Sequence, residues 1–441
     1  MRMPEPTAHS VLLIRAVDTE PATYISFRWL DDPQHPEVHA IRDVELRRLV
    51  AQLDRALPGS DSGDGSLAIA SALTGPFTRK LSEYALNEAI GRAVFPAVVR
   101  TAIVERSRRG SVTVRITPSR TLARMPLELA VIGDSRRLIE FADISYEPPA
   151  AIHAGRARIP EAWTDAVASR PVAYIVDPRL PAGSGLGQVL DWQRPGAVNA
   201  AVLSKHIAGL PHTANSGVGR IVGRWELSDD LVAKPSRLLY VGHISSTLDE
   251  PGSAAMHLTD DAAEWGYATV MNSAHLPFSA LDLLLGTASP ELGPADRSPV
   301  EPNRTGRSLW PMPPRVALIA CEGGADYRSS ETFGLVMAIF NAGAEIVTTS
   351  RWMLPSDEAF RVHCGLDSAP GPTTELALGV DATHRAADPV RALNDWQRSK
   401  FAQWQLDPGP ATSPLTWAAM ACHACPPRPL HRLHGAGDSD D

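Results

Sequence analysis

Two apolar runs of this sequence end in a side chain that could take part in catalysis. Residues 238–242 precede His243, and residues 316–320 precede Cys321. Such short, continuously apolar runs are typical of strands buried on both faces of a parallel sheet. The carboxyl ends of neighbouring parallel strands face one crevice, where a thiol and an imidazole can meet. The imidazole and the amino end of a following helix would favour the nucleophilic thiolate at neutral pH. The spacing leaves a second interpretation open, in which Cys321 is a small buried apolar residue and His243 a hydrogen-bonded loop histidine.

The elements that must position these residues are predicted from the same patterns. Apolar runs over 172–176, 237–241, 316–320 and 346–350 predict buried strands, and the stretch over 331–341, ended by Gly343, predicts a crossover helix. Ahead of them, we expect a hairpin over 10–15 and 23–29, a helix over 41–57, helices over 78–105 broken at Pro96, and strands over 112–116 and 138–146. The fold class is therefore α/β, with a mainly parallel sheet flanked by helices. Pro148-Pro149 marks the predicted boundary between an N-terminal α/β region, 1–155, and a second domain, 165–441. The Pro-rich stretch 289–314 predicts a long surface loop.

The amino-acid composition and charge argue against several classes of protein. The 441 residues include 44% hydrophobic and 21% charged residues, which is typical of a globular protein. The net charge of -8 argues against direct binding to nucleic acid. No run approaches the roughly 18 to 20 apolar residues of a membrane span, and residues 1–20 lack the apolar core of a signal peptide, so we expect no membrane association and a cytoplasmic location. The four cysteines, at 321, 364, 422 and 425, are too few for a disulfide framework and are expected to be reduced.

The segment from Ala320 to Gly324 reads Ala-Cys-Glu-Gly-Gly. It is similar to the Ala-Cys-Glu-Ser-Gly signature of CHAT domains, which are caspase-like cysteine proteases related to separases. Other similar segments are Leu122 to Leu129 with Pro126, Val176-Asp177-Pro178, Gly334 to Ala338, Asn341 to Ala344, Val347 to Ser350 with Trp352, Asp357 to Ala359, and Pro414 with Trp417 to Ala419. The resemblance runs discontinuously from about 112 to 422. It implies a caspase-like sheet in the second domain and, ahead of it, a degenerate first half of the CHAT module.

The resemblance also implies roles for individual residues. Cys321 would be the nucleophile, His243 the catalytic imidazole, and the amides of Cys321 and Ile244 the donors to the oxyanion. The family usually has glycine after this histidine, and a β-branched Ile244 restricts the backbone there. Activity as a cysteine endopeptidase and a catalytically inactive scaffold or protein-binding module therefore both stay open. No cofactor is required, and the expected partners are a protein or peptide substrate and an activating sensor protein, in a bacterial stress or conflict system.

In caspase-like folds the segment just past the last of these strands lines the pocket for a substrate side chain. Ser350, Arg351, Trp352 and Asp357 are the candidates here. The alternative is that Trp352 packs under the loop and Arg351 is solvated. Arg351 would attract an acidic substrate side chain, and Asp357 with Glu358 a basic one, so the preferred charge is not decided.

Two other motifs are weaker. Cys422-x-x-Cys425 followed by His431 and His434 offers zinc-binding atoms, but the loop between the two pairs is short and rich in proline, so no metal is expected. Gly183-x-Gly185-x-Gly187 follows a predicted strand, but no helix clearly starts on it, which argues against a dinucleotide site.

Overall fold

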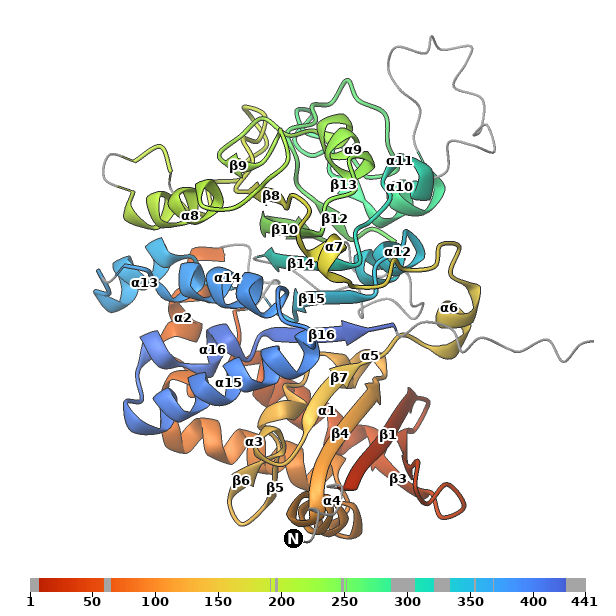
Figure 1. Cartoon of the computed structure of the whole chain (residues 1–441). Coiled ribbons are helices and arrows are strands. Elements are labelled where there is room, and N and C mark those ends of the chain that lie inside the picture. The colour runs from red at the N-terminus through yellow and green to blue at the C-terminus, as the bar shows by residue number, and fades with distance from the viewer. Residues whose placement is uncertain are drawn as a thin grey trace, which may run out of the picture.

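The computed structural model contains one large sheet with helices on both faces (Figure 1). It describes residues 8–58, 65–190, 192–194, 197–246, 250, 252–286, 306–320, 334–352, 354–367 and 369–425. The sheet has 11 strands in the order β3-β2-β1-β4-β7-β16-β15-β14-β10-β8-β9. Most neighbouring strands run parallel, which confirms the predicted α/β class with a mainly parallel sheet.

The N-terminal elements form one end of this sheet, at the bottom of Figure 1. They are β1 (Ala8–Asp18), β2 (Ala22–Trp29), β3 (Glu37–Arg42), α1 (Asp43–Asp54), α2 (Gly65–Leu73), α3 (Lys80–Val94), α4 (Ala97–Arg109), β4 (Gly110–Thr117), α5 (Arg120–Ala123), β5 (Val131–Gly133), β6 (Arg136–Arg137) and β7 (Asp143–Tyr146). The predicted hairpin is the antiparallel pair β1 and β2, and Pro96 separates α3 from α4 as expected. The strand predicted over 138–146 is wrong in its first half. There Leu138–Glu140 form a 3-10 turn, because the Glu140 carboxylate accepts the Arg137 backbone N–H at 2.6 Å.

The second half of the chain supplies the other strands. Its elements are α6 (Ala150–Gly155), α7 (Asp165–Ala168), β8 (Ala173–Val176), α8 (Val198–Ala208), β9 (Gly217–Val218), α9 (Arg224–Val232), β10 (Arg237–Gly242), β11 (Ile244–Ser245), β12 (Ala255–Met256), β13 (Phe278–Ser279), α10 (Ala280–Leu285), α11 (Gly306–Leu309), β14 (Arg315–Ala320), α12 (Leu335–Asn341), β15 (Ile346–Ser350), α13 (Asp357–Cys364), α14 (Pro372–Thr383), α15 (Pro389–Leu406), α16 (Pro414–Trp417) and β16 (Met420–Ala424). The four buried strands predicted here are β8, β10, β14 and β15, each within one residue of the predicted bounds.

Side chains alternate between two buried cores on opposite faces of the sheet. On β14, Val316 and Leu318 belong to one apolar cluster, and Ala317 and Ile319 belong to the other. Helix α12 contributes to the first cluster and α14 to the second. This explains the continuously apolar runs, because each residue of a strand covered on both faces must be apolar.

The predicted boundary lies in the segment that leads from β7 to β8. The sheet continues across this boundary, because β7 pairs with β16 through Tyr146 and His423. The C-terminal strands β15 and β16 lie between the N-terminal strands and β14, as Figure 1 shows in blue. No helix in the described part of the chain is long and apolar enough to cross a membrane.

Candidate active site

The register of two parallel strands sets the residues before the predicted catalytic pair side by side. β10 and β14 are neighbours, and Gly242 on β10 lies opposite Ala320 on β14. His243 directly follows the first of these residues, and Cys321 directly follows the second. Cys321 itself, with its backbone amide, lies outside the described residues. The sheet therefore brings together the two strand ends that the sequence hypothesis requires.

His243 is oriented by a backbone carbonyl. The half-buried imidazole has its Nε2 atom 2.8 Å from the carbonyl oxygen of Gly187. Because a carbonyl only accepts hydrogen bonds, Nε2 must carry the hydrogen, and in the neutral ring Nδ1 carries a lone pair. This tautomer leaves Nδ1 as the atom that can take up a proton.

Asp177 fixes the loop that contains Gly187. Its carboxylate accepts the backbone N–H groups of Val189 at 3.0 Å and Leu190 at 2.9 Å. Its own N–H donates to the carbonyl of Val241 on β10 at 2.6 Å. The chain turns sharply at Asp177, which has a positive φ of 47°. Asp177 therefore ties the loop to the strand that leads to His243.

The peptide between His243 and Ile244 is also held in place. The His243 carbonyl accepts the Tyr240 hydroxyl at 2.6 Å and the His257 backbone N–H at 3.0 Å. Both donors fix the plane of this peptide. In a trans peptide the N–H points opposite to the carbonyl, so the Ile244 N–H is directed away from β12. An amide with a fixed direction is what an oxyanion site needs.

The Ile244 side chain does not lie in the crevice. It is 2% exposed and belongs to the buried apolar cluster that includes Met256 and Phe278. Gly242 makes room for Tyr240, because a Cβ atom there would lie 2.6 Å from the Tyr240 hydroxyl. The residue after His243 is thus apolar for a packing reason, and its backbone N–H is still directed away from β12.

A line of hydrogen-bonded side chains lies behind His243. The Ser245 hydroxyl is 2.8 Å from His257 Nε2, His257 Nδ1 is 3.0 Å from His275 Nε2, and His275 Nδ1 is 2.7 Å from the Asp260 carbonyl oxygen. The His243 and His257 rings meet edge to face, with centroids 6.4 Å apart. Burial, together with the neighbouring His275 and His243, lowers the pKa of His257 to about 3. Burial also lowers the pKa of His275, so both rings are neutral at neutral pH.

Three of the predicted substrate-binding residues are packed inside the protein. Ser350 is 0% exposed, at the end of β15. The Arg351 guanidinium pairs with the Glu128 carboxylate, donates to the Ala418 carbonyl at 3.0 Å, and lies over the Tyr146 ring. The Trp352 indole donates to the Leu415 carbonyl at 2.8 Å and stacks on Phe77.

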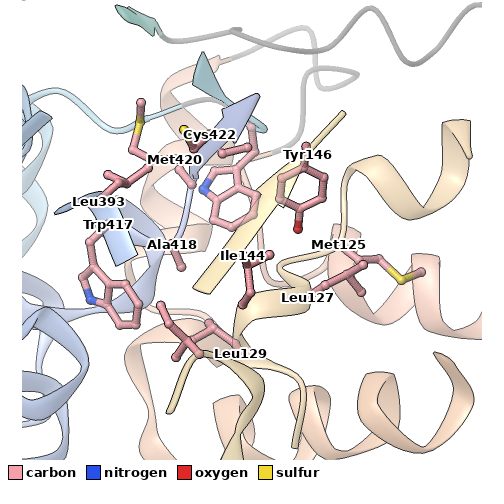
Figure 2. Close-up of a cluster of buried hydrophobic side chains, with 14 of the residues drawn as sticks. Met125, Leu127, Leu129, Ile144, Tyr146, Leu393, Trp417, Ala418, Met420 and Cys422 are labelled. Carbon is pink, nitrogen blue, oxygen red and sulfur yellow. The ribbon is translucent and has the colours of Figure 1, made fainter. Parts of the chain in front are cut away.

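These contacts join segments that the resemblance picked out separately. Glu128 belongs to the Leu122 to Leu129 segment, Arg351 follows β15, and Ala418 lies in the last similar segment. Figure 2 shows the apolar cluster to which Leu127, Leu129, Ile144, Trp417 and Ala418 belong, with Leu127 beside Ile144. Trp352 thus packs as the alternative interpretation expected, whereas Arg351 is buried and not solvated.

Asp357 has a different environment. Its carboxylate accepts the N–H groups of Thr373 at 2.7 Å and Thr374 at 3.0 Å, at the start of α14. Burial raises its pKa, and these hydrogen bonds lower it again in part. Asp357 also lines a cavity of about 210 Å³, together with Val189, Leu190, Arg194, Glu358 and Arg361 among others. This cavity adjoins the loop that orients His243, because Val189 is two residues from Gly187.

The sequence did not reveal the roles of six residues: Asp177 and Gly187 as positioning groups, and Tyr240, Ser245, His257 and His275. The only signal was indirect, since Asp177 lies in one of the CHAT-like segments and Gly187 in the glycine motif. The spacing of the histidines follows no ligand or catalytic pattern.

The two weaker motifs gain no support. The structure describes no helix between 178 and 190, the stretch that contains the three glycines. Cys422 and Cys425 are buried thiols, the second of which accepts a hydrogen bond from Arg156, and His431 and His434 lie outside the described residues. Within the described ranges, no three or more His, Cys, Asp or Glu residues are placed to hold a metal ion.

No protein-family model matches the chain, and no curated protein matches it. The resemblance to CHAT domains therefore rests on the sequence motifs alone.

Proposed function

We propose that this chain is a caspase-like cysteine endopeptidase in which Cys321 attacks a peptide carbonyl and His243 transfers the proton. The observation that supports the proposal is the pairing of Gly242 with Ala320, because His243 and Cys321 directly follow these two residues in the sequence. The hydrogen bond from His243 to Gly187 supports it further, since it leaves Nδ1 available for the proton.

The reaction would proceed through an acyl-enzyme. Cys321 loses its proton to His243 Nδ1, and the Gly187 carbonyl stabilises the resulting imidazolium through Nε2–H. The thiolate attacks, and the Ile244 N–H, fixed by Tyr240 and His257, binds the oxyanion together with the Cys321 amide. His243 then protonates the leaving amine. Water hydrolyses the thioester and restores the thiol.

The substrate would be a protein segment, with one side chain in the cavity beside Val189 and Asp357. Arg351 is a poor candidate to bind a substrate, because its guanidinium is already paired with Glu128. The resemblance further suggests an activating sensor protein and a role in a bacterial stress or conflict system. A scaffold that binds without cleaving is the second candidate, favoured by Ile244 in place of the family's glycine.

Thiol reactivity tests the catalytic pair without a known substrate. With limiting iodoacetamide at pH 7, we expect Cys321 to react at least about tenfold faster than Cys364, because a thiolate beside an imidazole forms at lower pH. Cys364 is the internal control, since it is half-buried and burial raises its pKa. Peptide mapping by mass spectrometry measures both rates. His243→Gln should abolish the difference, and equal rates in the unmodified protein would contradict the proposal.

Cleavage separates the protease from the scaffold. The full chain and its Cys321→Ala variant are each incubated with a peptide library made from a bacterial proteome, with and without lysate. New peptide ends that depend on Cys321 support the protease. Their absence in both conditions, with a reactive Cys321, favours the scaffold.

A further inference from the structure

The hydrogen bonds behind His243 have only one possible direction. The Asp260 carbonyl can only accept, so His275 must donate from Nδ1. The Nε2 atom of neutral His275 then accepts, so His257 donates from Nδ1. The Nε2 atom of neutral His257 is left as an acceptor, and its partner, the Ser245 hydroxyl, must donate to it. The Asp260 carbonyl thus determines, through the two neutral rings, that the Ser245 hydroxyl hydrogen points toward His257 Nε2.

Both rings stay neutral because of their surroundings. His257 is 1% exposed and His275 is 0% exposed. Beside burial, His275 and His243 lower the pKa of His257, and the Arg224 guanidinium lowers the pKa of His275. The Asp260 carboxylate is bound by the Arg224 side chain and backbone N–H, so it does not provide a counter-charge to the rings. At neutral pH these hydrogen bonds therefore keep the direction given above.

Ser245 consequently offers lone pairs, and no hydrogen, to its other neighbours. Its side chain is half-buried, on the short strand β11. It is two residues from His243 along an extended segment, so both side chains lie on one face. Both also lie against the His257 ring, His243 in an edge-to-face arrangement of the two rings and Ser245 through a hydrogen bond. An obligatory acceptor thus lies beside the imidazole that is proposed to act as the base.

We propose that Ser245 holds the water that hydrolyses the acyl-enzyme. An attacking water must give one hydrogen to a base and needs a second acceptor to fix its orientation. His243 Nδ1 takes the first proton, and Ser245 Oγ accepts a hydrogen bond from the O–H that remains. The water oxygen forms a bond to the acyl carbon, the bond from carbon to the Cys321 sulfur breaks, and His243 returns the proton to the thiolate. This inference rests on the proposed function.

A second nucleophile is the other interpretation of such a serine, and the geometry disfavours it. A serine nucleophile needs a base that can hold its proton during attack. His257 is enclosed, its other nitrogen binds a neutral His275, and no carboxylate contacts it among the described residues. Protonated His257 would be uncompensated, so Ser245 acts as an acceptor.

Acetylation with p-nitrophenyl acetate tests the inference. The full chain should release a burst of p-nitrophenol as Cys321 is acetylated, followed by slower turnover limited by hydrolysis. Ser245→Ala should leave the burst rate unchanged and lower the steady rate about tenfold, the effect of one hydrogen bond. Ser245→Thr, which keeps the hydroxyl, should restore the steady rate. Ser169→Ala is the matched control, because Ser169 is exposed and its hydroxyl bonds to the Ala166 carbonyl beside its own helix.

Hydroxylamine tests whether the slow step in Ser245→Ala is hydrolysis of the acetyl thioester by water. It cleaves the acetyl thioester directly, so at high concentration it should bring Ser245→Ala and the unchanged protein to the same rate. An unchanged steady rate, or equal losses in burst and steady rate, overturns the role of Ser245 and leaves the peptidase proposal standing. If mass spectrometry finds no acetyl group on Cys321, both proposals fail.

NMR of 15N-labelled histidine tests the hydrogen-bond direction independently of activity. His257 and His275 should both show the neutral tautomer with hydrogen on Nδ1 at pH 7 to 8. Hydrogen on Nε2 of His257 would make Ser245 a donor to the crevice and overturn the inference.

Discussion

Tyr240→Phe is the sharpest test of how the candidate oxyanion amide is held. The Tyr240 hydroxyl donates to the His243 carbonyl at 2.6 Å, and the ring is 0% exposed. The substitution removes this donor and keeps the ring. The carbonyl then keeps only the His257 backbone N–H, at 3.0 Å, so the peptide that carries the Ile244 N–H can tilt.

The expected magnitude is that of removing one of the two hydrogen bonds to this carbonyl. One buried hydrogen bond contributes about 1 kcal/mol to folding, so the free energy of unfolding should fall by about that amount. A complete oxyanion donor is worth about 3–4 kcal/mol in the barrier. Because one of the two anchors remains, we expect the barrier to acylation to rise by about 1.4 kcal/mol, which is about a tenfold slower acylation.

The assay is the burst of p-nitrophenol from p-nitrophenyl acetate, with urea denaturation measured in parallel. Tyr174→Phe is the matched control, because Tyr174 is equally buried on β8 but bonds to Asp381 and Arg237. It should lose stability and keep its burst rate. If both variants lose stability and neither changes the burst rate by more than about twofold, the anchoring of the His243 carbonyl does not serve catalysis and our reasoning is refuted.

Three further outcomes are expected from the packing and burial of the chain. Ile244→Gly should lower the free energy of unfolding by about 3–5 kcal/mol in urea, because it empties a buried site and adds backbone freedom; a loss below about 1 kcal/mol would show that Ile244 is not packed. Arg351→Met should cost about 3–5 kcal/mol, because it leaves the buried Glu128 carboxylate unpaired, and adding Glu128→Gln should recover most of the loss; no recovery would mean that the pair is not the cause. Burial lowers the pKa of His384 to about 3, so below pH 6.5 the unfolded chain binds a proton that the folded protein does not. The stability difference between the unchanged protein and His384→Gln should therefore fall by about 1.4 kcal/mol per pH unit from pH 6.5 downward, and a difference independent of pH would contradict this.

The strands that carry the candidate site could be predicted because burial on both faces leaves a strong pattern. In β10 and β14 nearly every position must be apolar, so both strands and the two residues after them could be located from the sequence. The 3-10 turn at Leu138 could not, because it depends on one hydrogen bond that the Arg137 backbone N–H donates to the Glu140 carboxylate.

The residues that surround the candidate site could not be predicted from the sequence, for a physical reason. Gly187, His257 and His275 reach His243 and Ser245 through loops and very short strands, whose paths depend on tertiary contacts and leave no periodicity. The role of Arg351 could not be predicted from the sequence for the same reason. A charged residue after a strand resembles a binding residue, and only the position of Glu128, far away in sequence, explains it as an internal ion pair.

The pairing of β7 with β16 has a practical consequence for work on the second half of the chain. A fragment that begins near residue 165 would lack β7 and Glu128, so β16 would present an open edge and Arg351 would lose its counter-ion. Unpaired strand edges are templates for aggregation. Such a fragment is expected to be poorly soluble and inactive, and an inactive fragment would say nothing about the chemistry of His243 and Cys321. In this protein the N-terminal strands cover the edge of β16 that would otherwise be open in the half that carries the candidate site.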